Sequence, residues 1–257
     1  MEFVDLAEAK QRTGLKLVVV AGIPSPWGEA AKSILHVKKI PFAAVPFVPG
    51  QSDGITAWTG CTNAPIAVYA DEPPRSGWAE ILVLAERLAP EPRLLPADPD
   101  ERALCFGLCH ELCGEMGFGW SRRLTGIHDA FTSDGKAGFS VPIAEYLAPR
   151  YGYRPDGAAE AHRRVLEVLR MLTRRLQAQK KAGSRYYLGD SLTALDIYSA
   201  TFMVLIKPLP KEQCDIPDEV RQGLASIDPE IEKAADPILL EHRDAIYRDH
   251  LVLPLEL

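Results

Sequence analysis

A proline-rich stretch at residues 89–99, APEPRLLPADP, sets the strongest constraint on how this chain folds. Four of its eleven residues are proline, which fixes φ, has no backbone N–H and interrupts both helices and interior strands. No single helix or strand can therefore run through it. We expect two domains, at residues 1–90 and 99–257, joined by a linker at residues 91–98.

Residues before this stretch alternate between strand and helix patterns. The run LKLVVVAG (15–22) is continuously apolar and rich in β-branched residues, which is typical of a strand buried on both faces. Residues 1–14 are either a frayed lead-in or a helix packed on the domain. This order of elements predicts a small α/β domain with a parallel first pair of strands. The remaining expected elements are strands at 41–48 and 64–71, helices at 25–39 and 77–88, and a proline-containing edge strand near 71–74.

Helical periodicity dominates after the proline-rich stretch. One apolar stripe recurs every four residues and predicts the buried face of a first helix. Its members are Leu104, Leu108, Leu112 and Met116. The segment 130–155 is rich in glycine, proline and aromatic residues, shows no clear period, and is expected to be a loop over another part of the molecule. The expected helices are 99–118, 156–182, a central apolar helix at 193–207, and one around 229–250.

Charge and hydropathy exclude several classes of protein. The net charge of −6 and the isoelectric point near 5.6 argue against a nucleic-acid-binding surface. No apolar run approaches the ~18 residues of a membrane span. The N-terminus, MEFVDLAEAKQR, lacks the basic start and apolar centre of a secretory signal. We expect a cytoplasmic protein that binds neither nucleic acid nor membrane.

The five cysteines are an odd number without a C-x-x-C pair, which indicates reduced thiols rather than a disulfide framework. Cys105, Cys109 and Cys113 recur every four residues. Each such step rises about 6 Å along a helix, so the outer two sulfurs lie about 12 Å apart. One zinc ion with Zn–S bonds of about 2.3 Å cannot reach all three. We expect no metal, and buried packing cysteines instead.

The stretch DSLTALDIY contains a helix start. Thr193, followed three residues later by Asp196, fits a capping box in which Asp replaces the usual Glu or Gln. Judged alone, the pattern is only a helix cap. The longer stretch YYLGDSLTALDIYSATF closely resembles the start of the buried core helix in the all-helical domain of cytosolic glutathione S-transferases, where this cap organises folding.

The N-terminal half resembles the thioredoxin-like, glutathione-binding domain of the same superfamily. PSPWGEAAK looks like its Ser-Pro-Phe or Cys-Pro-Phe element, with Ser25 at the catalytic position. NAPIAVY looks like its cis-proline element, which implies a cis Pro65 and an Ala64 whose backbone pairs with glutathione. PRSGWAEI looks like the element that receives the γ-glutamyl carboxylate, with Ser76 matching the serine. The resemblance implies a thioredoxin-like α/β N-terminal domain followed by an all-α C-terminal domain.

Two places depart from the family pattern. Arg75 stands where an acidic or amide residue is usual, and Glu29 with Ala30 stand where an arginine is usual. The guanidinium of Arg75 is a candidate clamp for the glutathione carboxylate, and Trp27, next to Ser25, is a further candidate contact. The resemblance also implies a pocket for the second substrate near the end of the first long helix. Its candidate lining residues are Phe118, Trp120 and Arg123.

The position of Ser25 before a helix suits thiolate chemistry. The thiol of glutathione is mostly protonated at pH 7, because an ordinary thiol titrates near ~8.5. A helix N-terminus offers unpaired N–H groups and roughly half a positive charge, which favours a nearby anion. The hydroxyl of Ser25 can donate a further hydrogen bond to the sulfur. The alternative is a simple N-cap, and one hydroxyl can serve both purposes.

The resemblance implies a homodimeric glutathione transferase active in detoxification. Glutathione would be the co-substrate, and its thiolate would attack a small apolar electrophile. Two alternatives stay open. One is a weakly active or inactive transferase fold that serves as a binding or interaction module, and the other is a specialised glutathione-dependent lyase for ether cleavage or dehalogenation.

Overall fold

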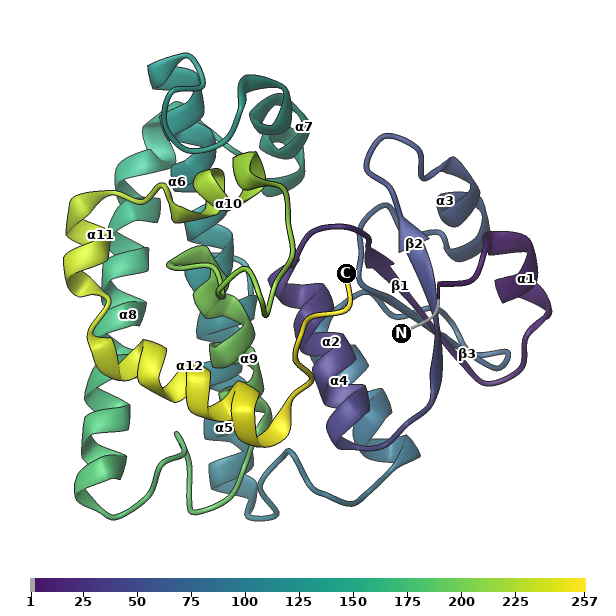
Figure 1. Cartoon of the computed structure of the whole chain (residues 1–257). Helices are drawn as coiled ribbons and strands as arrows, with labels where there is room; N and C mark the ends of the chain where they lie inside the picture. The colour runs from purple at the N-terminus through teal and green to yellow at the C-terminus, as the bar shows by residue number, and fades with distance from the viewer. Residues whose placement is uncertain (1–2) are drawn as a thin grey trace.

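A small mixed β-sheet organises the N-terminal half of the computed structural model, which describes residues 3–257 (Figure 1). The strand order is β2-β1-β3. β1 runs parallel to β2, with Leu15 opposite Phe42, and antiparallel to β3, with Leu15 opposite Tyr69. The predicted parallel first pair of strands is therefore confirmed. The strands are β1 (Leu15–Val20), β2 (Phe42–Phe47) and β3 (Ile66–Tyr69).

The two faces of β1 are buried by different helices. Leu17 and Val19 belong to the same core as α2 and α4, whereas Val18 packs with Ala9 of α1 and Ile55 of α3. This division follows from the two-residue period of a strand, and it explains why β1 is apolar except for Lys16. Figure 1 shows α2 and α4 between the sheet and the helical half, with α1 and α3 on the other side. The four helices are α1 (Leu6–Gln11), α2 (Pro26–Val37), α3 (Asp53–Thr59) and α4 (Trp78–Leu88).

The predicted edge strand near residues 71–74 is not formed. A single antiparallel bridge joins Ala67 to Arg75 instead, through hydrogen bonds of 2.8 and 2.9 Å between their backbone groups. Pro73 and Pro74 have no N–H to donate to a neighbouring strand. The chain therefore touches β3 only where the prolines have ended.

Helix α1 decides between the two alternatives for residues 1–14, and helix α3 was not predicted from the sequence. Of residues 1–14, the first two lie outside the described residues. The others include α1, so of the two alternatives, a frayed lead-in or a helix, the helix is confirmed. It is capped by Asp5, whose side chain accepts the N–H of Glu8 at 2.8 Å. α3 was not predicted, because it has seven residues and only Ile55 and Thr59 of it are buried, too few to show a helical period.

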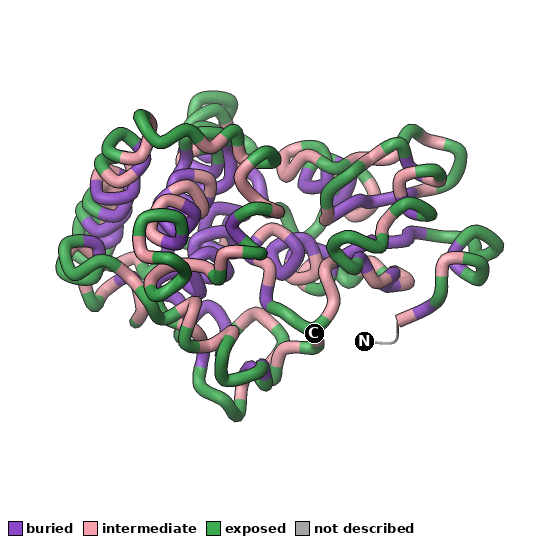
Figure 2. Tube along the Cα trace, turned by 90° about the horizontal axis from the view of Figure 1, so that it is seen from above, coloured by how far each residue is buried: buried purple, intermediate pink, exposed green. Residues whose placement is uncertain are grey.

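The C-terminal half consists of helices around α9 (Figure 1). Every residue of α9 is buried, which confirms the predicted central helix, and α8 confirms the helix expected at 156–182. Figure 2 shows buried segments inside this half and exposed loops around it. The elements are α5 (Pro99–Cys113), α6 (Phe118–Ser133), α7 (Val141–Tyr151), η1 (Pro155–Gly157), α8 (Ala158–Lys181), α9 (Ala194–Phe202), η2 (Met203–Leu205), α10 (Asp218–Ala225), α11 (Pro229–Ala234) and α12 (Pro237–His250).

The helix predicted at 99–118 ends early, and only the middle of its predicted apolar stripe is buried. α5 stops at Cys113, and α6 begins at Phe118 after a left-handed Met116. Leu108 and Leu112 are buried, whereas Leu104 and Met116 are 43% and 40% exposed. The stripe one residue further along the helix is buried, as predicted for packing cysteines. Adjacent stripes lie only about 100° apart on a helix, so the sequence pattern did not distinguish them. The buried cysteines are Cys105, Cys109 and Cys113.

Two other predictions in this half are wrong. Residues 130–155 hold the end of α6 and the helix α7, not a loop, because Pro142 in the first turn and Pro149 inside α7 mask the period. The helix expected around 229–250 is two helices, and α10 was missed. An aspartate cap followed by proline starts both α11, at Asp228, and α12, at Asp236. Asp–Pro is a strong start signal, which here cuts one apparent helix in two.

The proline-rich stretch is well packed although it is irregular. Leu94 and Leu95 are buried, and the carbonyl of Leu94 accepts the N–H of Ala194 at 2.8 Å. The division at residues 91–98 falls within this connection and stays a prediction. Within residues 3–257, no helix combines the length and apolar character needed to cross a lipid bilayer.

Candidate functional site

Three segments that are distant in sequence meet at the carboxyl end of β1. This strand ends at Val20 and leads into the turn before α2. β3 starts beside it, because Val18 pairs with Ile66, so Pro65 lies at the same end of the sheet. The bridge between Ala67 and Arg75 brings the start of α4 there as well. The topology therefore gathers the segments of Ser25, Pro65 and Ser76 at one edge.

Ser25 lies at the N-cap of α2, as predicted. Its backbone is extended, with φ −67° and ψ 119°, and its carbonyl accepts the N–H of Glu29 at 2.8 Å. Pro26 fills the first helical position, where the missing N–H costs nothing. The hydroxyl of Ser25 makes no capping hydrogen bond and is half-buried. The alternative of a side-chain cap is therefore wrong, and the hydroxyl is free to donate to a ligand.

The peptide bond between Ala64 and Pro65 is cis, which confirms the conformation that the sequence resemblance implied. Pro65 is buried at the start of β3, and Ala64 is half-buried against the core that contains Ile55 and Ile66. The role of the Ala64 backbone in pairing with a bound peptide stays a prediction.

Ser76 is exposed and does not cap α4. Gly77 takes the cap position, and its N–H donates at 3.1 Å to the carboxylate of Glu80. Glu80 thus supplies one half of a capping box and leaves the Ser76 hydroxyl without a hydrogen bond within residues 3–257. Its role in receiving a carboxylate stays a prediction.

The guanidinium of Arg75 is already paired. It contacts the carboxylate of Glu72 at 2.5 Å, and Arg87 contacts the same carboxylate at 2.6 Å. Hydrogen bonds from Arg87 and then Arg75 hold the pKa of Glu72 below its ordinary value. Arg75 would have to leave this exposed ion pair to clamp a carboxylate of a ligand.

Glu29 lies one turn into α2. It is 6% exposed and forms an ion pair with Lys32 at 2.7 Å. Burial raises the pKa of its carboxyl, although Lys32 partly opposes this. Lys32 also donates to the backbone carbonyl of Glu256. Glu29 therefore pairs with the lysine that links α2 to the C-terminal segment.

Trp27 lies between the two halves of the protein. Its indole N–H donates to the carbonyl of Cys113 at 2.9 Å, and its ring packs edge-on against Phe202 with centroids 4.8 Å apart. Tyr151, at the end of α7, lies 6.4 Å from Trp27 and 4.7 Å from Trp120 by ring centroids. Sequence reasoning missed Tyr151 because its helix was expected to be a loop.

The three candidates for the second-substrate pocket have different neighbours, and their role in a pocket stays a prediction. Phe118 is fully buried in the main core. Trp120 donates to the carbonyl of Tyr151 at 3.2 Å. The guanidinium of Arg123 lies 5.4 Å from the ring centre of Phe139. Trp120 and Arg123 are three residues apart and lie on the same side of α6, whereas Phe118 faces the core.

A hollow of about 520 Å³ lies elsewhere, between α8, α11 and the start of α12. Because none of its lining residues belongs to the sheet edge, we do not assign it to the same site. Its lining residues are Arg170, Thr173, Arg174, Glu230, Lys233, Ala234, Asp236 and Pro237.

The chain was compared with protein families, curated proteins and solved structures, and only the solved structures gave matches. No protein-family model matches the sequence, and no curated protein matches it. The chain is similar in structure to a glutathione S-transferase from Methylobacterium radiotolerans in complex with glutathione sulfonate, with a TM-score of 0.61 and 21% identity over 95% of this chain and 97% of the other.

Other solved structures share the architecture at similar distance. One is glutathione transferase Omega 3C from Trametes versicolor, with a TM-score of 0.58 and 16% identity over 95% of this chain and 89% of the other. Another is Ure2p in complex with glutathione, with a TM-score of 0.58 and 16% identity over 92% and 95%. The chain thus has the glutathione transferase fold, a thioredoxin-like domain followed by a helical domain.

Proposed function

We propose that this protein binds glutathione at the sheet edge formed by Ser25, Pro65 and Ser76. The observation that carries the proposal is the uncommitted hydroxyl of Ser25 at the N-terminus of a 12-residue helix. The structural neighbours in complex with glutathione or glutathione sulfonate support it. The backbone of Ala64 would pair with the peptide, and Ser76 would receive the γ-glutamyl carboxylate.

The chemistry follows from the charge distribution at the start of α2. The N–H groups of its first turn and the Ser25 hydroxyl would favour the thiolate over the thiol. Each unit by which the pKa of the thiol falls needs about 1.4 kcal/mol, which one helix terminus and one hydrogen bond can supply for one or two units. The thiolate sulfur would then attack a small apolar electrophile held against the helical domain. The enzyme would act as a cytoplasmic, homodimeric transferase in detoxification, and a specialised lyase would use the same sulfur.

The second candidate is a non-catalytic binding or interaction module. Two observations favour it over a general transferase. Arg75 is paired with Glu72, and the indole of Trp27 is fixed between the two halves of the protein by Cys113 and Phe202. Both side chains already have protein partners, which would compete with contacts to glutathione. A module of this kind would keep the fold and lose the thiolate.

Calorimetric titration of glutathione distinguishes the two candidates. Wild type is expected to bind with a dissociation constant of about 1 mM or tighter and to release a proton near pH 6.5. Ser25→Ala is expected to bind without releasing that proton. Ser33→Ala, on the same helix, serves as the matched control, and S-methylglutathione, which has no thiol proton, should release none. Binding without proton release in wild type would favour the non-catalytic module, and no binding would exclude glutathione as the ligand.

A further inference from the structure

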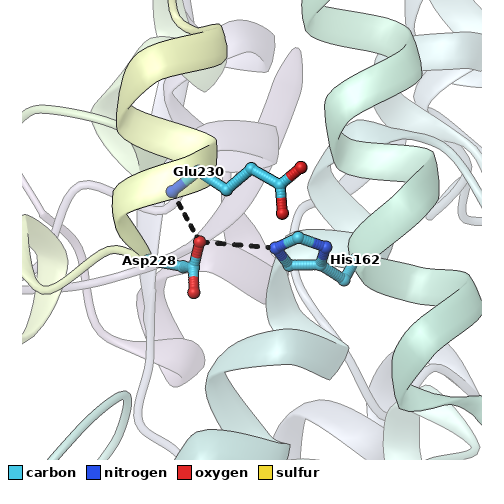
Figure 3. Close-up of side chains that lie close together, drawn as sticks. All are labelled: His162, Asp228 and Glu230. Carbon is cyan, nitrogen blue, oxygen red and sulfur yellow. Dashed lines mark hydrogen bonds and ion pairs between the residues drawn. The ribbon is translucent and has the colours of Figure 1, made fainter.

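Three side chains with metal-binding atoms meet where the first turns of α8 face the start of α11. They are His162, Asp228 and Glu230, and one ligand atom from each lies within 4.8 Å of the others. Figure 3 shows the Glu230 carboxylate reaching from α11 towards His162, while Asp228 approaches the same imidazole from the start of the helix. Ligands about 2.0–2.2 Å from one ion are at most about 4.4 Å apart, so small side-chain rotations would close the site.

The backbone that carries these side chains is held on both sides. Asp228 caps α11, with its carboxylate accepting the N–H of Glu230 at 2.7 Å. The segment before it is held by the buried Arg122 of α6, which donates to the carbonyl of Ser226 at 2.8 Å. His162 projects from the 24-residue helix α8. Two rigid elements therefore hold the ligands in place, as a specific metal site requires.

Among residues 3–257, none of the three side chains forms an ion pair outside the cluster, and the short hydrogen bond of Asp228 comes from the backbone of Glu230. His162 Nε2 lies 3.5 Å from Asp228 Oδ1, which is at the limit of a hydrogen bond. The carboxylate of Glu230 has neither a hydrogen bond nor an ion pair with any residue from 3 to 257. The side chains of His162 and Asp228 are 29% and 46% exposed, so an ion can enter from solvent.

Cations lie near this cluster but do not occupy it. The buried guanidinium of Arg122 interacts electrostatically with Asp228, but it donates hydrogen bonds to the carbonyls of Leu205 and Ser226. The exposed cations Arg170, Arg174 and Lys233 line the neighbouring hollow with Glu230. Within residues 3–257, none of these forms an ion pair with Asp228 or Glu230. The two carboxylates thus keep their charge available.

We infer that His162, Asp228 and Glu230 form a binding site for a divalent transition-metal ion such as Zn²⁺, separate from the sheet edge. An imidazole nitrogen with two carboxylate oxygens suits such ions better than Mg²⁺ or Ca²⁺, which take oxygen ligands. Three protein ligands leave at least one coordination position for water. The ion would join α8 to α11, so its binding would stabilise the helical half of the native chain.

Titration of the full chain with Co²⁺, followed by competition with Zn²⁺, tests this inference. Wild type is expected to bind one Co²⁺ with visible d–d absorption that Zn²⁺ removes. It should show no ultraviolet band of thiolate-to-cobalt charge transfer, because no cysteine is a ligand. His162→Gln is expected to weaken binding by at least about tenfold. His36→Gln, which changes an exposed histidine in the last turn of α2, is expected to leave binding unchanged.

A second measurement covers the possibility that a variant alters the fold. Zn²⁺ should raise the melting temperature of wild type and of His36→Gln, and should leave that of His162→Gln and Glu230→Gln unchanged. The inference is overturned if wild type shows no saturable binding, if His162→Gln binds as well as wild type, or if a thiolate band appears. It is equally overturned if equimolar Mg²⁺ displaces the Co²⁺.

Discussion

The indole N–H of Trp27 donates a 2.9 Å hydrogen bond to the carbonyl of Cys113 and so ties the first turn of α2 to the last turn of α5. Carbonyls at the end of a helix have no partner within the helix, and this one is satisfied from the other half of the protein. The proposed thiolate helix is thus positioned by contacts with the helical domain.

Replacing Trp27 with phenylalanine should weaken this connection. The variant keeps an aromatic ring beside Phe202 but leaves the Cys113 carbonyl without its donor. We expect the free energy of unfolding to fall by about 1–2 kcal/mol, measured by urea denaturation. Trp58→Phe, in the other core, is a suitable comparison. Equal stability of Trp27→Phe and wild type would show that the hydrogen bond contributes nothing.

Gly119 lies where α6 meets α2 and α9. An added Cβ would come within 2.4 Å of Phe202 and 3.0 Å of Trp27. Gly119→Ala should therefore lower stability by about 1–3 kcal/mol through overpacking. A Cβ at Gly107, inside α5, would meet no atom within 4 Å, so Gly107→Ala should raise stability by up to about 1 kcal/mol. Thermal unfolding of both variants measures the contrast, which two shifts of the same sign would contradict.

Asp196 is the most heavily bonded buried carboxylate that we describe. It is fully buried and accepts from the backbone N–H groups of Tyr187 and Thr193, from the Thr193 hydroxyl and from His242, at 2.8–3.0 Å. Asp196→Ala should cost at least about 3 kcal/mol, read from the urea midpoint or, if the protein no longer folds, from the soluble fraction. The exposed Asp190→Ala should stay within about 0.5 kcal/mol of wild type; similar losses in both would rule out a special role.

The thiols should differ sharply in reactivity. Cys61 is half-exposed, whereas Cys105, Cys109, Cys113 and Cys214 are buried. Burial also raises the pKa of Cys109, Cys113 and Cys214, which lowers the fraction of reactive thiolate. Dithionitrobenzoate should titrate one thiol rapidly in native protein, none in Cys61→Ser and all five of wild type in denaturant. Rapid reaction of a second thiol in the native state would contradict the packing.

His250 should make stability depend on pH. Burial and then the charge of Arg185 hold the pKa of His250 below its ordinary value of about 6.5. The unfolded chain therefore takes up a proton first, so the contribution of His250 is present above pH 6.5 and is lost as pH falls below it. His250→Gln removes this loss. The stability of the variant relative to wild type should rise between pH 7 and pH 5 in urea denaturation, and a constant difference would refute the assignment.

Local patterns were predictable from the sequence where one short segment determines the outcome. The N-cap position of Ser25 and the bond from Thr193 to Asp196 each depend on a few neighbouring residues. The cis peptide at Pro65 was expected from the family resemblance alone. β1 was recognised because burial on both faces favours a run of apolar residues, which here is interrupted only by Lys16. Apart from the cis peptide, each of these features was therefore predictable from one short segment.

Contacts between distant segments were not predictable in this way. Trp27 meets Cys113 86 residues later, and Glu72 meets Arg87 15 residues later. Neither sequence neighbourhood contains a signal for its partner. The cluster at His162 has the same origin, since the two carboxylates follow it by more than 60 positions. Such sites depend on packing angles that periodicity does not specify.

The core around β1 continues without a break into the helical half, because Leu17 and Val19 share one apolar cluster with residues of α5, α8, α9 and α12. The proline-rich stretch therefore separates the two halves in sequence but does not separate their hydrophobic cores. The two halves should melt in a single cooperative transition, and residues 1–90 alone would expose the apolar face of α2 and α4. Exchange of either half between proteins of this fold would succeed only if the apolar residues that pack between the two halves are exchanged with it.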